Sequence, residues 1–218
     1  MDRQSQRRIA SLYQGRLQRG YVRGKLASDP VYAASAALLA GNPLPLLDIG
    51  CGIGLLGQYL HASGHTAAYL GVDRDARKII AGQRAAERGG LAAAIQLRCA
   101  DAHDLPPMQG HVALLDVLHY LPATAQQTLL LQAIRHLAPQ GRLIIRNVLR
   151  EANWRFHATR VEEFFLRASG WIPGGAQHYP DADELRQPLE AAGLTVRMEP
   201  LRGRTPFNSY LVVARHAC

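Results

Sequence analysis

Cysteine is scarce in this sequence and is spread far apart along it. Cys51, Cys99 and Cys218 form no Cys-x-x-Cys pair and have no neighbouring group of histidines suited to zinc. The spacing therefore predicts neither a disulfide framework nor a metal site, and we expect reduced thiols and no bound metal.

Long apolar runs are also missing. The most apolar segments are interrupted by Asp, Arg or Gly, so none reaches the length of about eighteen residues that a membrane-spanning helix needs. The first residues are too polar for a secretory signal peptide. From these absences we expect no membrane span and a cytoplasmic location.

Lysine is nearly absent as well, and arginine carries the positive charge. The formal net charge is +8, from 25 Lys and Arg against 17 Asp and Glu, yet Lys25 and Lys78 are the only lysines. Seven basic residues fall within the first 25 positions. Such a segment can bind nucleic acid or attract an acidic carrier protein, but arginine also gathers on solvated helix faces. Charge alone leaves these alternatives open.

What the sequence does contain is an alternation of apolar runs with amphipathic segments, which predicts an α/β fold with a parallel sheet. Its 218 residues suit a single domain. Two leading helices are expected, over 3–25 and about 30–39, before the breaker Gly41-Asn42-Pro43. Further helices are predicted at 54–63, 75–89, 123–137 and 181–192, and strands at 45–49, 67–72, 93–98, 112–117, 142–147, 194–199 and 208–215.

The same pattern divides the single domain, residues 1–218, into four parts. We expect an N-terminal helical cap (1–40), a ligand-binding core (41–147), a substrate lid (148–180), and a C-terminal helix and hairpin (181–218). The lid is predicted from composition, because this segment holds both tryptophans and three of the four phenylalanines.

The most informative motif is Asp48-Ile-Gly50-Cys-Gly52-Ile-Gly54, which follows a short apolar run. Alternate glycines predict a tight turn from a strand into a helix, where a ligand can approach the backbone and the helix offers free N–H groups. Gly52 to Gly57 also fit the G-x-G-x-x-G dinucleotide pattern, and Asp73 follows at the distance of a ribose-binding acid. NAD is therefore one candidate. Asp48 favours another, because a carboxylate there would repel a pyrophosphate but suits the amino group of S-adenosylmethionine (SAM).

At these residues the chain resembles the class I SAM-dependent methyltransferases, in particular their small-molecule branch. Four motifs occur in order: Asp48 to Gly54, Leu70-Gly-Val-Asp73, Cys99-Ala-Asp101-Ala-His-Asp104, and Leu114-Leu-Asp116-Val-Leu-His119-Tyr120. The resemblance is close over roughly residues 40–148. It implies the class I methyltransferase fold, with a seven-stranded, mostly parallel sheet, the last strand antiparallel, and helices on both faces. It also implies that SAM is the cofactor and S-adenosylhomocysteine (SAH) the product.

The resemblance further implies roles for individual residues. Asp48 would anchor the SAM ammonium through water or nearby backbone, and Asp73 would accept the ribose hydroxyls. Asp101 would bind the adenine amino group, with Asp104 as the rival acid. The full set expected to bind the cofactor is Asp48, Gly50, Cys51, Gly52, Gly54, Asp73, Arg74, Asp101, Ala102 and Asp116.

For the methyl acceptor, His119 is the best-placed general base, since its ordinary pKa of about 6.5 suits removal of a hydroxyl proton. Its alternative role is as a wall of the pocket. The expected substrate pocket comprises Tyr120, Arg146, Trp154, Phe156, His157, Phe165, Trp171 and His178. Many of these side chains could equally serve in packing or as solvated charges.

Taken together, the sequence predicts methyl transfer to a small molecule, foremost to oxygen of an aromatic or acyl metabolite that a carrier protein could present. The fourth motif lacks the two prolines common in nucleic-acid amino methyltransferases, which disfavours that chemistry. Three rivals stay open: an RNA methyltransferase that uses the basic N-terminal helices, a non-catalytic SAM-binding protein, and a nicotinamide-dependent oxidoreductase. The sequence does not indicate an oligomeric state.

Overall fold

The computed structural model describes residues 1–102, 104–151, 175–201, 203 and 208–217. Its strands are β1 (Leu46–Ile49), β2 (Tyr69–Asp73), β3 (Ile95–Cys99), β4 (His111–Leu115), β5 (Leu143–Val148), β6 (Leu194–Pro200) and β7 (Ser209–His216). Its helices are α1 (Arg3–Leu12), α2 (Arg16–Ser28), α3 (Val31–Leu39), α4 (Leu55–Ala62), α5 (Ala76–Arg88), the short 3-10 helix η1 (Leu118–Tyr120), α6 (Ala123–Arg135) and α8 (Ala182–Ala191).

The strands form one seven-stranded sheet in the order β3-β2-β1-β4-β5-β7-β6. The pairs β3-β2, β2-β1, β1-β4 and β4-β5 are parallel, whereas β7 runs antiparallel to both β5 and β6. The predicted fold class is therefore confirmed, including the antiparallel final strand. Because β1, β2, β4 and β5 all run the same way, their carboxyl ends meet at one edge, where open α/β sheets bind ligands.

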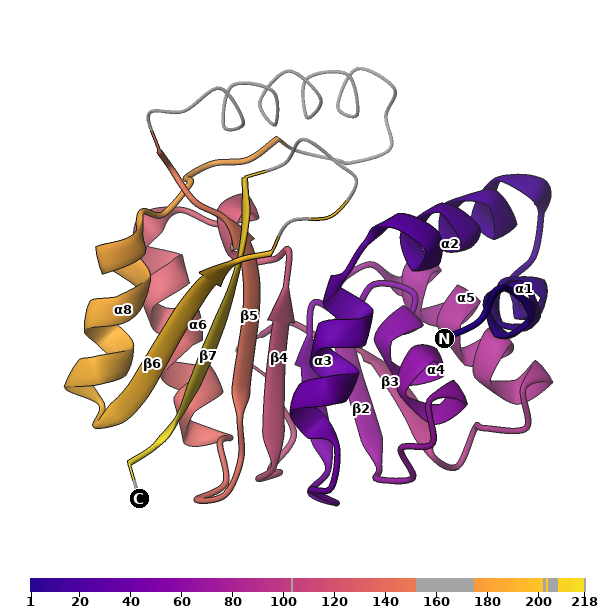
Figure 1. The fold of residues 1–218 in the computed structure, drawn as a ribbon, viewed down its shortest axis with the longest axis horizontal. Coiled ribbons are helices and arrows are strands. Elements are labelled where there is room, and N and C mark those ends of the chain that lie inside the picture. Colours follow the sequence, from indigo (N-terminus) through magenta and orange to yellow (C-terminus); the bar gives the residue numbers. More distant parts are fainter. Residues whose placement is uncertain (103, 152–174, 202, 204–207, 218) are drawn as a thin grey trace.

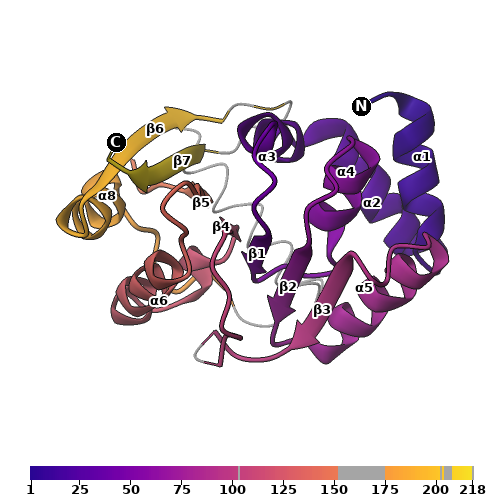
Figure 2. The same cartoon turned by 90° about the horizontal axis from the view of Figure 1, so that it is seen from below.

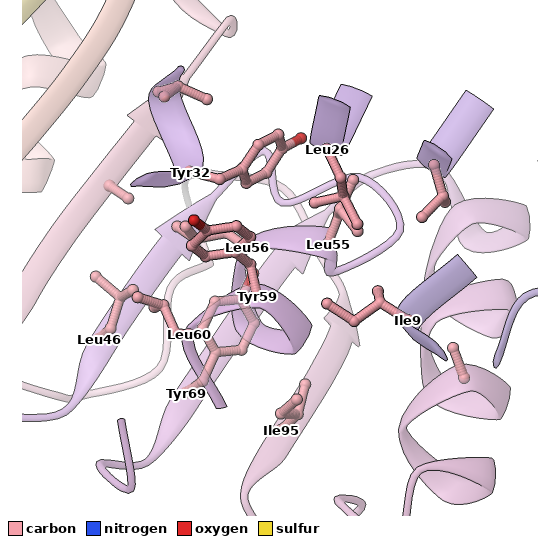
Figure 3. Packing of buried hydrophobic residues seen from close by; sticks show 14 of the residues in the cluster. Ile9, Leu26, Tyr32, Leu46, Leu55, Leu56, Tyr59, Leu60, Tyr69 and Ile95 are labelled. Carbon is pink, nitrogen blue, oxygen red and sulfur yellow. The ribbon is translucent and has the colours of Figure 1, made fainter. Parts of the chain in front are cut away.

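Helices cover both faces of the sheet (Figures 1 and 2). Alternate side chains of β1 show how the faces divide, because Leu46 belongs to the core cluster that holds residues of α1 to α5, and Leu47 to the cluster that holds residues of α6 and α8. Figure 3 shows the first of these layers, in which Ile9 of α1 and Leu26 of α2 lie around α4. The N-terminal helices are thus part of the main core.

The N-terminal segment differs from the prediction, which had a single helix over residues 3–25. The structure has two helices there, α1 and α2, separated at Gly15, whose φ is +75°. The break lets α1 pack beside α5, while α2 lies toward the end of the molecule to which the parallel strands point (Figure 1). Tyr13, at the end of α1, is fully buried, and its hydroxyl donates to the carbonyl of Ile53 in the glycine loop at 3.1 Å. The N-terminal helices are thereby connected directly to the glycine motif.

The other elements lie within a few residues of their predicted bounds. Most of the expected lid, residues 152–174, lies outside the described residues. None of the described helices is long and apolar enough to cross a membrane.

Candidate cofactor and methyl-transfer site

The glycine loop follows β1 and has left-handed backbone at its three alternate glycines. Gly50, Gly52 and Gly54 have φ values of +78°, +58° and +69°, a region that other L-residues rarely adopt. The N–H groups of Gly50 and Cys51 donate to the carbonyl of Val72 on β2 at 2.7 and 3.1 Å, which holds the start of the loop on the neighbouring strand. Gly54 is the N-cap of α4. The motif therefore forms the strand-to-helix turn that the sequence predicts.

The space around the three glycines differs. A Cβ on Gly50 would lie 2.3 Å from the side chain of Val117, and one on Gly54 would lie 2.9 Å from Leu97, whereas one on Gly52 would meet nothing within 4 Å. Gly50 and Gly54 are packed against protein, and Gly52 faces open space. The backbone at Gly52 is thus the part of the loop that a ligand can approach closely, which fits the cofactor that the motif implies.

Asp73 at the end of β2 is bonded to this loop. Its carboxylate accepts hydrogen bonds from the N–H of Gly52 at 2.9 Å and from the N–H of Asp75 at 2.8 Å. The acid therefore fixes the position of Gly52 relative to β2. The neighbouring Arg74 is exposed, and the ribose-binding role of Asp73 stays a prediction.

Asp48 lies beneath the loop, where only 2% of it is exposed. The Tyr69 hydroxyl donates to one carboxylate oxygen at 2.5 Å, and the other oxygen has no hydrogen-bond partner among the described residues. Burial raises the pKa of Asp48 to about 7, although the bond from Tyr69 opposes the rise. A cation nearby would favour the ionised form. Contact between Asp48 and the SAM ammonium remains a prediction.

Cys51 and Asp101 are two further residues that the sequence predicts to lie at the cofactor. The thiol of Cys51 points toward Gly71 of β2, and burial, followed by the charge of Asp48, raises its pKa well above the ordinary value. A thiol of that kind is a poor nucleophile. Asp101 is exposed in the loop after β3, beside the half-buried Ala102, and its carbonyl accepts from the N–H of Asp104 at 3.0 Å. Asp104 is exposed as well, and the binding of adenine by Asp101 stays a prediction.

His119 lies in η1, just after β4, and is 3% exposed. Its Nδ1 is 2.9 Å from Oδ1 of Asn147, and the amide nitrogen of Asn147 donates to the carbonyl of Val148 at 2.9 Å. With the amide oriented in this way, Oδ1 accepts a hydrogen bond from Nδ1–H, and Nε2 carries the lone pair. The ring of His119 stacks on Tyr179 with centroids 5.9 Å apart and planes 6° apart, and the Tyr120 ring lies at 4.1 Å. The imidazole is held in the tautomer that a base acting through Nε2 requires.

Asp116 and Arg146 bind each other. Asp116, directly after β4, is the only non-glycine residue with positive φ, +60°, among those that the structure describes. Arg146 on β5 pairs with the Asp116 carboxylate and, at 3.1 Å, with Asp29 between α2 and α3. Lys25 lies 3.1 Å from Asp29 and 3.8 Å from Asp116. Both terminal nitrogens of Arg146 therefore have carboxylate partners, and its predicted contact with substrate remains untested.

Only part of the remaining predicted pocket lies within the described residues. His178 is half-buried, with Nε2 3.1 Å from the Glu184 carboxylate, and its carbonyl accepts from Gln126 at 2.8 Å. Trp154, Phe156, His157, Phe165 and Trp171 lie outside the described residues. In the described part of the chain, no three His, Cys, Asp or Glu side chains gather as a metal site.

Sequence reasoning missed Asn147, Asp29 and Lys25. Asn147 could have been noticed in the sequence, because it and the neighbouring Arg146 are the two polar side chains of an otherwise apolar β5, and Asn147 is fully buried. Asp29 precedes α3 and accepts a hydrogen bond from the N–H of Val31 at 3.1 Å, a local role that its place before the helix explains. Its second role, toward Arg146, links residues 117 positions apart, a separation at which no local pattern operates.

Comparison with known proteins agrees with this geometry. A family model described as a methyltransferase domain matches residues 46–141. A ubiquinone biosynthesis O-methyltransferase of Rhodopseudomonas palustris (strain BisB5) is 29% identical over 206 residues, which cover 85% of this chain and 75% of that protein. A protein of the same name from Nitrobacter winogradskyi is 31% identical over 81% of this chain, although the match spans only 65% of that relative.

Among solved structures, the magnesium protoporphyrin IX methyltransferase of Synechocystis PCC 6803, crystallised with SAH, superposes with a TM-score of 0.71. The match covers 98% of this chain and 94% of that one, at 20% sequence identity, so it speaks for the fold.

The fold and the glycine loop define a SAM-dependent methyltransferase, and the matched family agrees. The chain has the class I methyltransferase fold, and its cofactor is SAM. The comparisons favour neither an RNA methyltransferase nor a non-catalytic SAM-binding protein.

The contrast between Gly50 and Gly52 gives a test of the loop. Gly52→Ala adds a methyl group where the protein leaves space, so we expect a folded protein, destabilised by about 1–2 kcal/mol through backbone strain, with SAH affinity reduced at least tenfold. Gly50→Ala adds a clash with Val117 to the same strain and should cost about 3 kcal/mol or more. Thermal unfolding and SAH titration check both variants. Wild-type SAH affinity in Gly52→Ala would contradict the assignment of the open face.

Proposed function

We propose that this enzyme transfers the SAM methyl group to a hydroxyl oxygen of a small aromatic acceptor, with His119 as the general base. The observation that carries the proposal is the His119–Asn147 pair at the carboxyl ends of β4 and β5, stacked against Tyr179. SAM would supply the electrophilic methyl group. The protein would position the acceptor, exclude water and remove its proton.

The residues proposed to hold SAM are those of the glycine loop and the acids around it. Gly52 would let the cofactor approach the main chain, and Asp73, already bonded to the Gly52 N–H, would accept ribose hydroxyls through its remaining lone pairs. Asp48, one of whose carboxylate oxygens has no partner among the described residues, would anchor the ammonium group through water or nearby backbone. Asp101 and Ala102 would serve the adenine, and Cys51, Gly50, Gly54 and Arg74 would complete the surroundings.

Three features support oxygen of an aromatic compound as the acceptor. Both curated relatives described above carry the name of an O-methyltransferase of ubiquinone biosynthesis. The aromatic rings of Tyr120 and Tyr179 flank His119 and can pack against a ring. A phenol has a pKa of about 10, so at neutral pH it arrives protonated and benefits from a base. His178 and the remaining lid residues are proposed as walls of the same pocket.

The proton would follow a short path. The Asn147 amide holds Nδ1–H of His119, so Nε2 would receive the acceptor proton as the oxygen attacks the methyl group in line. Most of the acceleration would come from alignment of acceptor and methyl group, and the base would add to it.

His119→Ala tests this chemistry. With a simple catechol at pH 7.5, we expect a loss in kcat of about 100-fold, the usual contribution of a general base. With a nitro-substituted catechol that is already ionised, the loss should be much smaller. SAH affinity should stay unchanged in both cases. An equal loss for the two acceptors would contradict base catalysis and leave His119 as a wall of the pocket.

A more specific form of this proposal is that the acceptor is an acyl or aryl group attached to a carrier protein in the cytoplasm. Arg3, Arg7, Arg8, Arg16, Arg19 and Arg23 are all exposed on α1 and α2, and residues 3–28 contain no acidic side chain. This surface would attract an acidic carrier protein.

Salt dependence separates the two versions. Because exposed charges are screened, the apparent KM for a carrier-bound acceptor should rise several-fold when ionic strength increases tenfold. The KM for the same group free in solution should stay nearly constant and serves as the control. If the KM for the carrier-bound acceptor does not change with ionic strength, the proposal of a carrier protein is wrong.

A further inference from the structure

Four charged side chains meet beside the glycine loop, and neither the SAM motifs nor the proposed base explains why they pair with one another. They are Lys25 of α2, Asp29 between α2 and α3, Asp116 after β4, and Arg146 of β5; we call them the charge quartet. Arg146 bridges Asp116 and Asp29, and Lys25 approaches both acids at 3.1 and 3.8 Å. Two positive and two negative charges give the quartet no net charge.

The quartet is largely removed from water. The side chains of Asp29 and Arg146 are 6% and 8% exposed, and those of Lys25 and Asp116 are 29% exposed. Burial alone would raise the pKa of Asp29, but Arg146 and then Lys25 outweigh it, so the pKa of Asp29 lies below its ordinary value. Asp29 is therefore ionised at neutral pH. Burying charges of this kind costs free energy unless they are paired. Removing one partner therefore leaves an uncompensated charge beside the site.

The quartet is close to the methyl-transfer site because of the sheet topology. β4 pairs with β1, so Asp116 lies beside the glycine loop, and the next residue, Val117, packs directly against Gly50. His119 follows two residues later. Asp116 also has the unusual backbone conformation with φ of +60°, and its N–H donates to the carbonyl of Arg146 at 2.9 Å. The side chain and backbone of Asp116 are thus both held by Arg146.

We propose that Asp29, Lys25 and Arg146 are positioning residues that act through Asp116, fixing it beside the transferred methyl group and keeping the charge there balanced. The inference rests on the proposed cofactor site. An uncompensated Asp116 would attract the sulfonium of SAM before reaction and oppose the loss of that charge during transfer. An excess positive charge would weaken SAM binding. The balanced quartet avoids both effects.

The test compares SAM with SAH, because these ligands differ in charge only at sulfur. Asp29→Asn keeps a side-chain oxygen for the Val31 N–H but leaves the quartet with one excess positive charge. It should weaken SAM relative to SAH. Lys25→Met keeps an apolar stem and leaves one excess negative charge, so it should strengthen SAM relative to SAH. Each change in the Kd ratio should be roughly fivefold, the effect of one unit charge about 10 Å away at an effective dielectric constant of about 35.

The double variant Asp29→Asn/Lys25→Met restores neutrality and should return the Kd ratio close to the wild-type value. Glu190→Gln, an exposed acid in the last turn of α8, is the control for a change of one charge elsewhere and should leave the ratio unchanged. Arg146→Met should shift the ratio in the same direction as Lys25→Met. If that variant does not fold, the Asp29 and Lys25 variants still decide the question.

Isothermal titration of both ligands gives the answer. Opposite shifts for Asp29→Asn and Lys25→Met, cancelled in the double variant, support the proposal. Equal losses for SAM and SAH, or shifts in the same direction, would assign the quartet a structural role only and overturn the proposal. If the wild-type protein binds neither ligand, the proposed cofactor site itself fails, which is a separate result.

Discussion

The structure depends on a short turn in which three glycines take left-handed conformations between β1 and α4. A hydrogen bond from the Gly52 N–H to Asp73 fixes this turn against the next strand, and Tyr13 of the N-terminal helices donates to the Ile53 carbonyl within it. The turn is therefore connected to the sheet on one side and to the N-terminal helices on the other. Its open face at Gly52 is where a ligand can come close to the backbone.

The parallel sheet brings the remaining chemistry to the same edge. Asp73 ends β2, Asp116 and His119 follow β4, and Asn147 lies near the end of β5. These residues are scattered over more than seventy positions of sequence but share one edge because their strands run in the same direction. In the proposed site, β1 and β2 would present most of the cofactor residues, whereas β4 and β5 would present His119 and Asn147 to the acceptor and Asp116 to the methyl group. The charge quartet connects the second group to α2 and α3.

Much of the fold could be predicted from sequence, because its signals are local. Apolar runs, glycines and prolines marked the strands and helices of the sheet to within a few residues. The break between α1 and α2 was missed, since the apolar spacing continues through Gly15 and the need for α1 to pack beside α5 is a tertiary effect. The positions of the cofactor motifs could also be predicted from the sequence, because the residues of each motif are close together in it.

The pairing of side chains could not be predicted from the sequence. Arg146 was expected near substrate, yet its terminal nitrogens bind Asp116 and Asp29, which are brought to it by strand pairing and by the α2–α3 connection. The role of Asn147 depends on its distance to His119, 28 residues away. Such contacts between distant residues have no periodic signal in the sequence.

If the glycine loop and its acids form a SAM site, the protein should bind SAH and not a dinucleotide. Thermal unfolding of the purified protein with SAH and, separately, with NAD tests it most directly. SAH at about 100 times its Kd should stabilise the fold by about 2.7 kcal/mol, which raises Tm by several degrees, while NAD should leave Tm unchanged. A rise in Tm with NAD and none with SAH would show that the loop is a dinucleotide site instead.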